Sequence, residues 1–170
     1  LYTSFLAAAF AEWGDKSQLL AAALTLRFGK PMPVFAGATI GILLGALLAA
    51  FGGILIHDMI VPRAASLLVG VALLYAGISG VMGAKVPATG ANWKSGALLT
   101  AATLTFLVEF GDKTQFLTAA IAARYDSLVL AATGAAAGAT LALAPAVLLG
   151  DRRRAAEVLV HDAGHQQFNG

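Results

Sequence analysis

The stretch EWGDKSQ, at residues 12–18, interrupts an otherwise apolar run of Ala, Leu and Phe with two carboxylates, an ammonium group and an amide. Almost the same stretch, EFGDKTQ, recurs at residues 109–115, again between apolar flanks. Charged side chains inside a membrane are costly, and where they occur they usually serve a function. The doubled stretch therefore determines both how the chain is organised and where a functional site is expected.

The composition is that of a membrane protein. Hydrophobic residues make up 59% of the 170 residues, charged residues only 12%, and the mean hydropathy is +0.81, whereas soluble domains carry about 25% charged residues. The apolar residues come in blocks of about twenty, the length that a helix needs to cross a bilayer. The net charge of +2, with basic residues confined to short gaps, does not indicate nucleic-acid binding. The absence of cysteine excludes disulfides, thiolate metal sites and thiol catalysis.

Five membrane spans are expected, at residues 1–26, 32–56, 64–82, 96–123 and 128–149. The gaps between them contain Gly, Pro or charged residues, which end helices or are disfavoured in hydrocarbon. When successive gaps are assigned to alternate sides of the membrane, most basic residues fall on one side. These are Arg27, Lys30, Lys85, Lys94, Arg152, Arg153 and Arg154. The other side holds only Arg63 and Arg124. By the positive-inside rule the first side is cytoplasmic and the N-terminus lies outside.

The doubled stretch belongs to a longer internal repeat. A shift of 97 positions carries Glu12 onto Glu109 and also superposes other identical residues: Leu20 on Leu117, Arg27 on Arg124, Gly37 on Gly134, Gly41 on Gly138 and Gly53 on Gly150. We predict two repeats, residues 1–86 and 87–170, each built on three spans. Because three is odd, the second repeat enters the membrane from the opposite side, as in inverted-repeat transporters. The glycines at four-residue spacing predict close helix packing.

The second repeat departs from this scheme at its end. Its third span should begin near position 161, where the sequence HDAGHQQFNG occupies residues 161–170 and cannot cross a bilayer. We expect either that the natural protein continues further or that this segment is replaced or incomplete. The predicted fold is an all-α integral membrane protein with two inverted three-helix repeats, five spans evident and the sixth missing or incomplete.

If the first copy is helical, its polar residues form a column of ligands. Glu12, Asp15 and Gln18 would then share one helical face, with their oxygen atoms in a row. Lys16, four residues after Glu12, could pair with it and limit the cost of a bare charge in the membrane.

The remaining residues of the stretch are matched between the two copies. Gly14 and Gly111 allow the backbone to bend and leave carbonyl groups available as ligands. Ser17 and Thr114 supply a hydroxyl at the same place in each copy, and Gln115 matches the amide of the first copy. Every candidate ligand is therefore a hard oxygen donor.

Over both copies the charges sum to −2, because two lysines, Lys16 and Lys113, stand against four carboxylates: Glu12, Asp15, Glu109 and Asp112. One divalent cation or two protons would neutralise this charge. Competition between them is the thermodynamic basis of proton-coupled antiport, provided that only the neutralised site reorients across the membrane. Oxygen ligands without His or Cys suit Ca²⁺, Mn²⁺ or Mg²⁺ and disfavour Zn²⁺ and Cu⁺.

Residues 1–150, with their two copies of E-x-G-D-K-[ST]-Q, resemble the family of small cation transporters that includes the Golgi calcium/manganese-proton antiporters and the bacterial manganese exporters. The resemblance implies metal coordination or proton exchange by the four carboxylates, supported by Ser17, Gln18, Thr114 and Gln115. It also implies proton-driven export of Mn²⁺ or Ca²⁺ from the cytoplasm, or transport into a Golgi-like lumen, without a prosthetic group. The expected location is the plasma membrane of a bacterium, with the lipid bilayer, metal ion and protons as the partners.

Other interpretations remain open at this stage. The same carboxylates could line a passive cation channel. Asp15 and Asp112, each preceded by Gly, resemble the paired aspartates of intramembrane proteases, but proteolysis gives no reason to copy a glutamate and a lysine along with each aspartate. A purely structural role, as salt bridges within each copy, would need the glutamates and lysines but not the aspartates. The sequence therefore favours a transporter over an enzyme.

Overall fold

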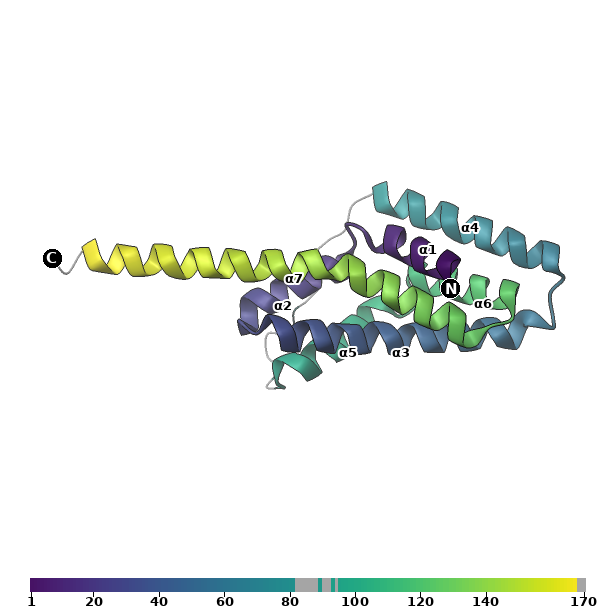
Figure 1. Ribbon diagram of the computed structural model, residues 1–170, viewed down its shortest axis with the longest axis horizontal. Helices are drawn as coiled ribbons and strands as arrows, with labels where there is room; N and C mark the ends of the chain where they lie inside the picture. The colour runs from purple at the N-terminus through teal and green to yellow at the C-terminus, as the bar shows by residue number, and fades with distance from the viewer. Residues whose placement is uncertain (82–88, 90–92, 94, 168–170) are drawn as a thin grey trace.

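The computed structural model describes residues 1–81, 89, 93 and 95–167, and over these residues the only regular secondary structure is helical (Figure 1). The described helices are α1 (Tyr2–Glu12), α2 (Lys16–Phe28), α3 (Pro31–His57), α4 (Pro62–Val81), α5 (Ala97–Glu109), α6 (Lys113–Tyr125) and α7 (Leu128–Gln167). This architecture confirms the predicted all-α membrane class.

Three of these helices contain segments long and apolar enough to cross a membrane: Pro31–His57, Pro62–Ser79 and Leu128–Arg153. Helices α1 and α2 are each shorter, as are α5 and α6, and the members of each pair follow one another along the long axis of the bundle (Figure 1). Each pair has about the length of one crossing.

The links between the helices have clear local causes. Helix α2 ends at Gly29, which takes up the left-handed conformation with a φ of 59°. Glycine adopts this conformation without a steric penalty and is the usual residue just after a helix. Pro31 then opens α3 and Pro62 opens α4, because proline is tolerated in the first helical turn, where no intrahelical N–H partner is required.

The condition for the ligand column, a helix through the doubled stretch, is not met, and the chain bends at the two glycines that the sequence marks as places where the backbone can bend. Residues 13–15 and 110–112 break the first and fourth spans into α1 and α2 and into α5 and α6. The cause lies in the backbone, since Gly14 has a φ of 78° and Gly111 a φ of 74°. A residue in this left-handed region cannot continue a right-handed helix. The column of ligands expected on one helical face is therefore replaced by a non-helical link in each repeat.

The two repeats are inverted relative to one another. Helices α1 and α2 run along the bundle in the direction opposite to α5 and α6, and α3 runs opposite to α7 (Figure 1). Helix α1 packs on α7, and α5 packs on α3 in the same manner. The shift of 97 positions therefore describes a symmetry of the fold as well as of the sequence.

Close packing at the repeated glycines supports this symmetry in detail. A Cβ atom on Gly41 would overlap the backbone of α5, and one on Gly138 would overlap the backbone of α1. The nearest carbonyl oxygens are those of Ala102 and Phe5, which are themselves 97 positions apart. Small residues at these places let the helix backbones approach closely, as the glycine spacing predicts.

The predicted sixth span has no counterpart among the described residues. Residues 161–167 continue α7, which ends at Gln167. Among the described helices, none takes the place in the second repeat that α4 has in the first. The predicted boundary between the repeats, at residues 86 and 87, lies outside the described residues.

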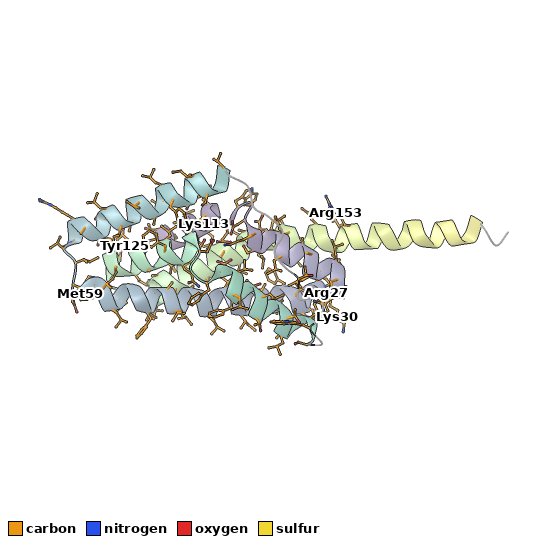
Figure 2. All side chains as sticks on the ribbon, turned by 180° about the vertical axis from the view of Figure 1, so that it is seen from behind. Arg27, Lys30, Met59, Lys113, Tyr125 and Arg153 are labelled. Carbon is orange, nitrogen blue, oxygen red and sulfur yellow. The ribbon has the colours of Figure 1, made fainter. Side chains whose placement is uncertain are left out.

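Basic side chains gather at one end of the bundle. Figure 2 shows Arg27, Lys30 and Arg153 at one end and Met59 and Tyr125 at the other. Leu1 lines the same cavity as Tyr125, so the N-terminus lies toward the second end. Between the ends, large apolar side chains face outward and alanines fill the core, as expected for a protein surrounded by lipid.

Candidate metal centre

The two helix breaks have the same backbone conformation. Asp15 has a φ of −83° and a ψ of 170°, and Asp112 has a φ of −79° and a ψ of 169°. Each aspartate follows a left-handed glycine and stands at the N-cap of the next helix, yet neither carboxylate caps that helix. Both aspartate side chains are therefore directed to other partners.

All four carboxylates of the doubled stretch lie inside the bundle. Glu12 is 1% exposed, Glu109 3% and Asp15 7%, and the side chain of Asp112 is 11% exposed. Glu12 and Glu109 are the last residues of α1 and α5, so each break follows a glutamate and ends at an aspartate. Four buried carboxylates close together are unfavourable unless cations or hydrogen-bond donors compensate them.

The lysines supply part of this compensation, and they do so across the repeats. Lys16 Nζ lies 2.8 Å from Asp112 Oδ1, and Lys113 Nζ contacts Asp15 Oδ1. The predicted pairing of Lys16 with Glu12 is wrong, because the break separates the end of α1 from the start of α2. Figure 2 shows Lys113 within the bundle. Each ion pair therefore joins the helix break of one repeat to that of the other.

The hydroxyl groups of the stretch both bond to the same carboxylate. Ser17 Oγ donates to Glu12 Oε2 at 2.6 Å, and Thr114 Oγ1 donates to Glu12 Oε1. Glu12 thus has donors on both oxygens, whereas Glu109 Oε1 meets no hydrogen-bond partner in the described part of the chain. The site is built from symmetric elements but is not symmetric in its hydrogen bonds.

The two glutamines fix the breaks instead of pointing their oxygens at the carboxylates. Gln18 Oε1 accepts the Gly14 N–H at 3.0 Å, and Gln115 Oε1 accepts the Gly111 N–H at 3.1 Å. Gln18 Nε2 also donates to the backbone carbonyl of Ala142 in α7, at 2.5 Å. Both amide oxygens, which were predicted to be ligands, are therefore engaged by the backbone.

Three carboxylates are placed so that they could hold one cation. Glu12, Asp15 and Asp112 each offer an oxygen, and these oxygens lie within 4.8 Å of one another. Ca²⁺ binds its oxygen ligands at about 2.3–2.6 Å, so oxygens on opposite sides of the ion stand about 5 Å apart. Asp15 Oδ2 and Asp112 Oδ2 are buried without a hydrogen-bond partner among the described residues, so both are available to a cation. The donor set fits a hard divalent ion.

Sequence reasoning missed a small cavity beside Glu109. Its walls are side chains or backbone of Ile42, Gly45, Ala46, Glu109, Thr114, Gln115, Thr118, Ala135 and Ala139, and its volume is about 10 Å³. That volume holds about one water molecule. The glycine spacing pointed to Gly45 as a helix-packing residue, but nothing in the sequence placed it next to Gln115.

An all-helical membrane protein with inverted halves, broken helices and buried carboxylates at their meeting point belongs to the class of membrane transporters. Residues 1–88 and 97–161 match the family model described as "Divalent cation/proton antiporter GDT1". The chain belongs to this family, which is a family of divalent-cation transporters and not of enzymes. This confirms the resemblance inferred from the doubled stretch.

One relative among the curated proteins is described as "Putative manganese exporter" and comes from Vibrio cholerae serotype O1 (strain ATCC 39541 / Classical Ogawa 395 / O395). It is 32% identical to this chain over 151 residues, which cover 88% of this chain and 76% of the relative. No solved structure matches the chain.

Proposed function

We propose that this protein exchanges a divalent cation, Mn²⁺ or Ca²⁺, for protons and exports the metal from the cytoplasm. The observation that carries the proposal is the cluster of carboxylate oxygens from Glu12, Asp15 and Asp112 within 4.8 Å of one another. The cluster draws on both inverted repeats, and two of its aspartate oxygens are buried without a partner in the described chain.

The four carboxylates have related roles in this proposal. Asp15 and Asp112 bind the cation with Glu12, and Glu109, with its unpartnered oxygen beside the small cavity, provides the fourth negative charge. In the arrangement described above, each aspartate is held by a lysine of the other repeat. These ion pairs keep the aspartates in place and limit the repulsion between them when no cation is bound.

Charge balance supports proton coupling. The four carboxylates and two lysines carry a net charge of −2, which either one divalent cation or two protons compensates. If the site changes its access from one side of the membrane to the other only when its charge is compensated, it exchanges the metal ion for protons. It then does not carry either of them alone. Moving an uncompensated charge through hydrocarbon is costly, and this cost opposes a leak.

The ligand chemistry limits the identity of the ion. The site offers carboxylate and hydroxyl oxygens, which suit Mn²⁺ and Ca²⁺ and disfavour Zn²⁺ and Cu⁺. The Vibrio cholerae relative carries manganese in its name, which favours Mn²⁺ as the first ion to test.

The positive charge at one end of the bundle supports an orientation of the protein in the membrane. Arg27, Lys30 and Arg153 gather at one end (Figure 2), and the positive-inside rule assigns this end to the cytoplasm. The N-terminus then faces outward. We place the protein in the inner membrane of a bacterium, with export as the working direction.

Flux measurements in proteoliposomes test this function. Vesicles loaded with a metal-sensitive dye receive Mn²⁺ or Ca²⁺ outside, with and without an imposed pH gradient. Metal should accumulate against its own gradient only when protons can move the other way. Equilibration of metal regardless of the pH gradient would instead identify a channel, because a channel cannot concentrate its ion.

Matched variants test the site itself. Asp112→Asn should abolish the exchange while the protein stays folded, because it removes one carboxylate of the cluster. Asp58→Asn makes the same chemical change at an exposed residue directly after α3 and should leave the exchange intact. Near-normal exchange in Asp112→Asn would refute the assignment of the site.

A further inference from the structure

The two glutamines of the doubled stretch differ in one hydrogen bond. Both accept the N–H of their own break glycine. Gln18 Nε2 also donates to the Ala142 carbonyl and so ties the first break to α7. Gln115 Nε2 is buried and has no hydrogen-bond partner in the described ranges. The second break is therefore not tied to α3 in the corresponding way.

The repeat symmetry identifies the partner that Gln115 lacks. The shift of 97 positions that relates Gln18 to Gln115 relates Gly45 of α3 to Ala142 of α7. Gln115 Nε2 already lies next to Gly45, since a Cβ built on Gly45 would be 2.7 Å from it. The Gly45 carbonyl is thus the symmetric counterpart of the Ala142 carbonyl, and it belongs to a residue beside Gln115.

A second asymmetry lies on the same side of the site. Both hydroxyl donors bond to Glu12, and Glu109 Oε1 is left without a partner in the described chain. The small cavity lies next to Glu109 and Gln115. The glutamate and the glutamine of the first repeat thus have partners that their counterparts lack, because Glu109 Oε1 and Gln115 Nε2 are both unpartnered in the described chain and line the same cavity.

We propose that Gln18 and Gln115 are positioning residues that engage in turn. In the arrangement described here, Gln18 ties the first break to α7 and Gln115 is released. In the alternate arrangement, Gln115 ties the second break to α3 through the Gly45 carbonyl and Gln18 is released. This inference rests on the proposed transport function, because it assigns the two arrangements to the two halves of the transport cycle. Inverted repeats exchange conformations in this manner when a fixed site is opened alternately to the two sides.

Cysteine accessibility tests the exchange without any transported ion. The chain has no cysteine, so single cysteines placed at Ala46, which lines the cavity, and at its symmetric counterpart Leu143 can be labelled individually with a small thiol reagent. Gln18→Met and Gln115→Met keep the side-chain length but remove the amide. Each variant is compared with the unaltered glutamines in the same reporter background.

The expected result is a pair of opposite changes. Gln18→Met removes the bond that holds the described arrangement, so the alternate arrangement gains and the Ala46→Cys reporter is labelled more slowly. Gln115→Met removes the bond of the alternate arrangement, so the same reporter is labelled faster. Each change should be about three- to ten-fold, as expected for one hydrogen bond. The Leu143→Cys reporter should respond with the opposite signs.

Two further variants keep the test decisive. Gly45→Ala would place a Cβ 2.7 Å from Gln115 Nε2 in the described arrangement, whereas the alanine at the symmetric place, Ala142, accepts the equivalent bond. It should therefore act in the same direction as Gln18→Met. The double variant Gln18→Met with Gln115→Met should return labelling toward the rate of the unaltered protein. If both single variants changed a reporter in the same direction, the glutamines would be only structural and the inference would be overturned. That result would not bear on the metal site, because no metal is present in the experiment. If the labelling changes were opposite but the flux assay failed, the result would count against the transport function alone.

Discussion

The two cross-repeat ion pairs should differ strongly in their contribution to stability. Lys113 and Asp15 are both buried, with side chains 4% and 8% exposed, whereas the side chain of Lys16 in the pair with Asp112 is 35% exposed. Replacing Lys113 by Met leaves the buried Asp15 carboxylate without its cation, which costs about 3–5 kcal/mol. Replacing Lys16 by Met should cost less, because water reaches Lys16 and screens part of its attraction to Asp112.

The free energy of unfolding measures this difference. Mixed-micelle titration with a denaturing detergent, followed by tryptophan fluorescence, compares Lys113→Met and Lys16→Met, which make the same chemical change at symmetric positions. Adding Asp15→Asn to Lys113→Met removes the uncompensated charge and should recover most of the lost stability. Equal destabilisation by the two single variants, or no recovery in the double variant, would refute the argument from burial.

Three further predictions follow from the packing and the hydrogen bonds. Gly138→Ala should destabilise the protein by about 1–3 kcal/mol, because the new Cβ would overlap the Phe5 carbonyl. The control Gly70→Ala, with no atom within 4 Å of its Cβ, should leave the free energy of unfolding unchanged or raise it. Thr114→Val removes one donor to Glu12 and should weaken metal binding by about five-fold, as for one hydrogen bond. Thr114→Ser keeps the hydroxyl and should keep the affinity. Equal affinity of the unaltered protein and both variants in a binding titration would contradict this role. Lowering the pH on the metal-loading side should slow metal uptake, because protons compete for the carboxylates. Raising the metal concentration should overcome this inhibition. If uptake stayed slow at excess metal, the result would argue against competition.

The sequence revealed the general design of the molecule because the repeat is unusually complete. Matched strings 97 positions apart predict matched local structure, and the two breaks have the same backbone angles. The repeated glycines predicted close packing, and the structure has it at Gly41 and Gly138. The inverted arrangement was predicted from the odd number of spans, and the structure joins the two acidic stretches of the inverted repeats through two ion pairs.

The details of the site were not predictable from spacing alone. Hydropathy identifies an apolar span but does not record that Gly14 takes a positive φ, so the ligand column rested on a helix that the structure breaks. Once the helix is broken, residues four positions apart no longer share a face, and Lys16 reaches Asp112 instead of Glu12. The asymmetry between Gln18 and Gln115 has no trace in the sequence, because the two residues are identical and only their partners differ.

The central claim is that both helix breaks together form a single cation site. Titration of the purified protein with Mn²⁺, by calorimetry, tests it most directly. The account predicts one bound ion per chain, and it predicts that Asp15→Asn and Asp112→Asn each abolish binding although they lie in different repeats. Two independent ions per chain, each lost only when the aspartate of its own repeat is changed, would contradict the account.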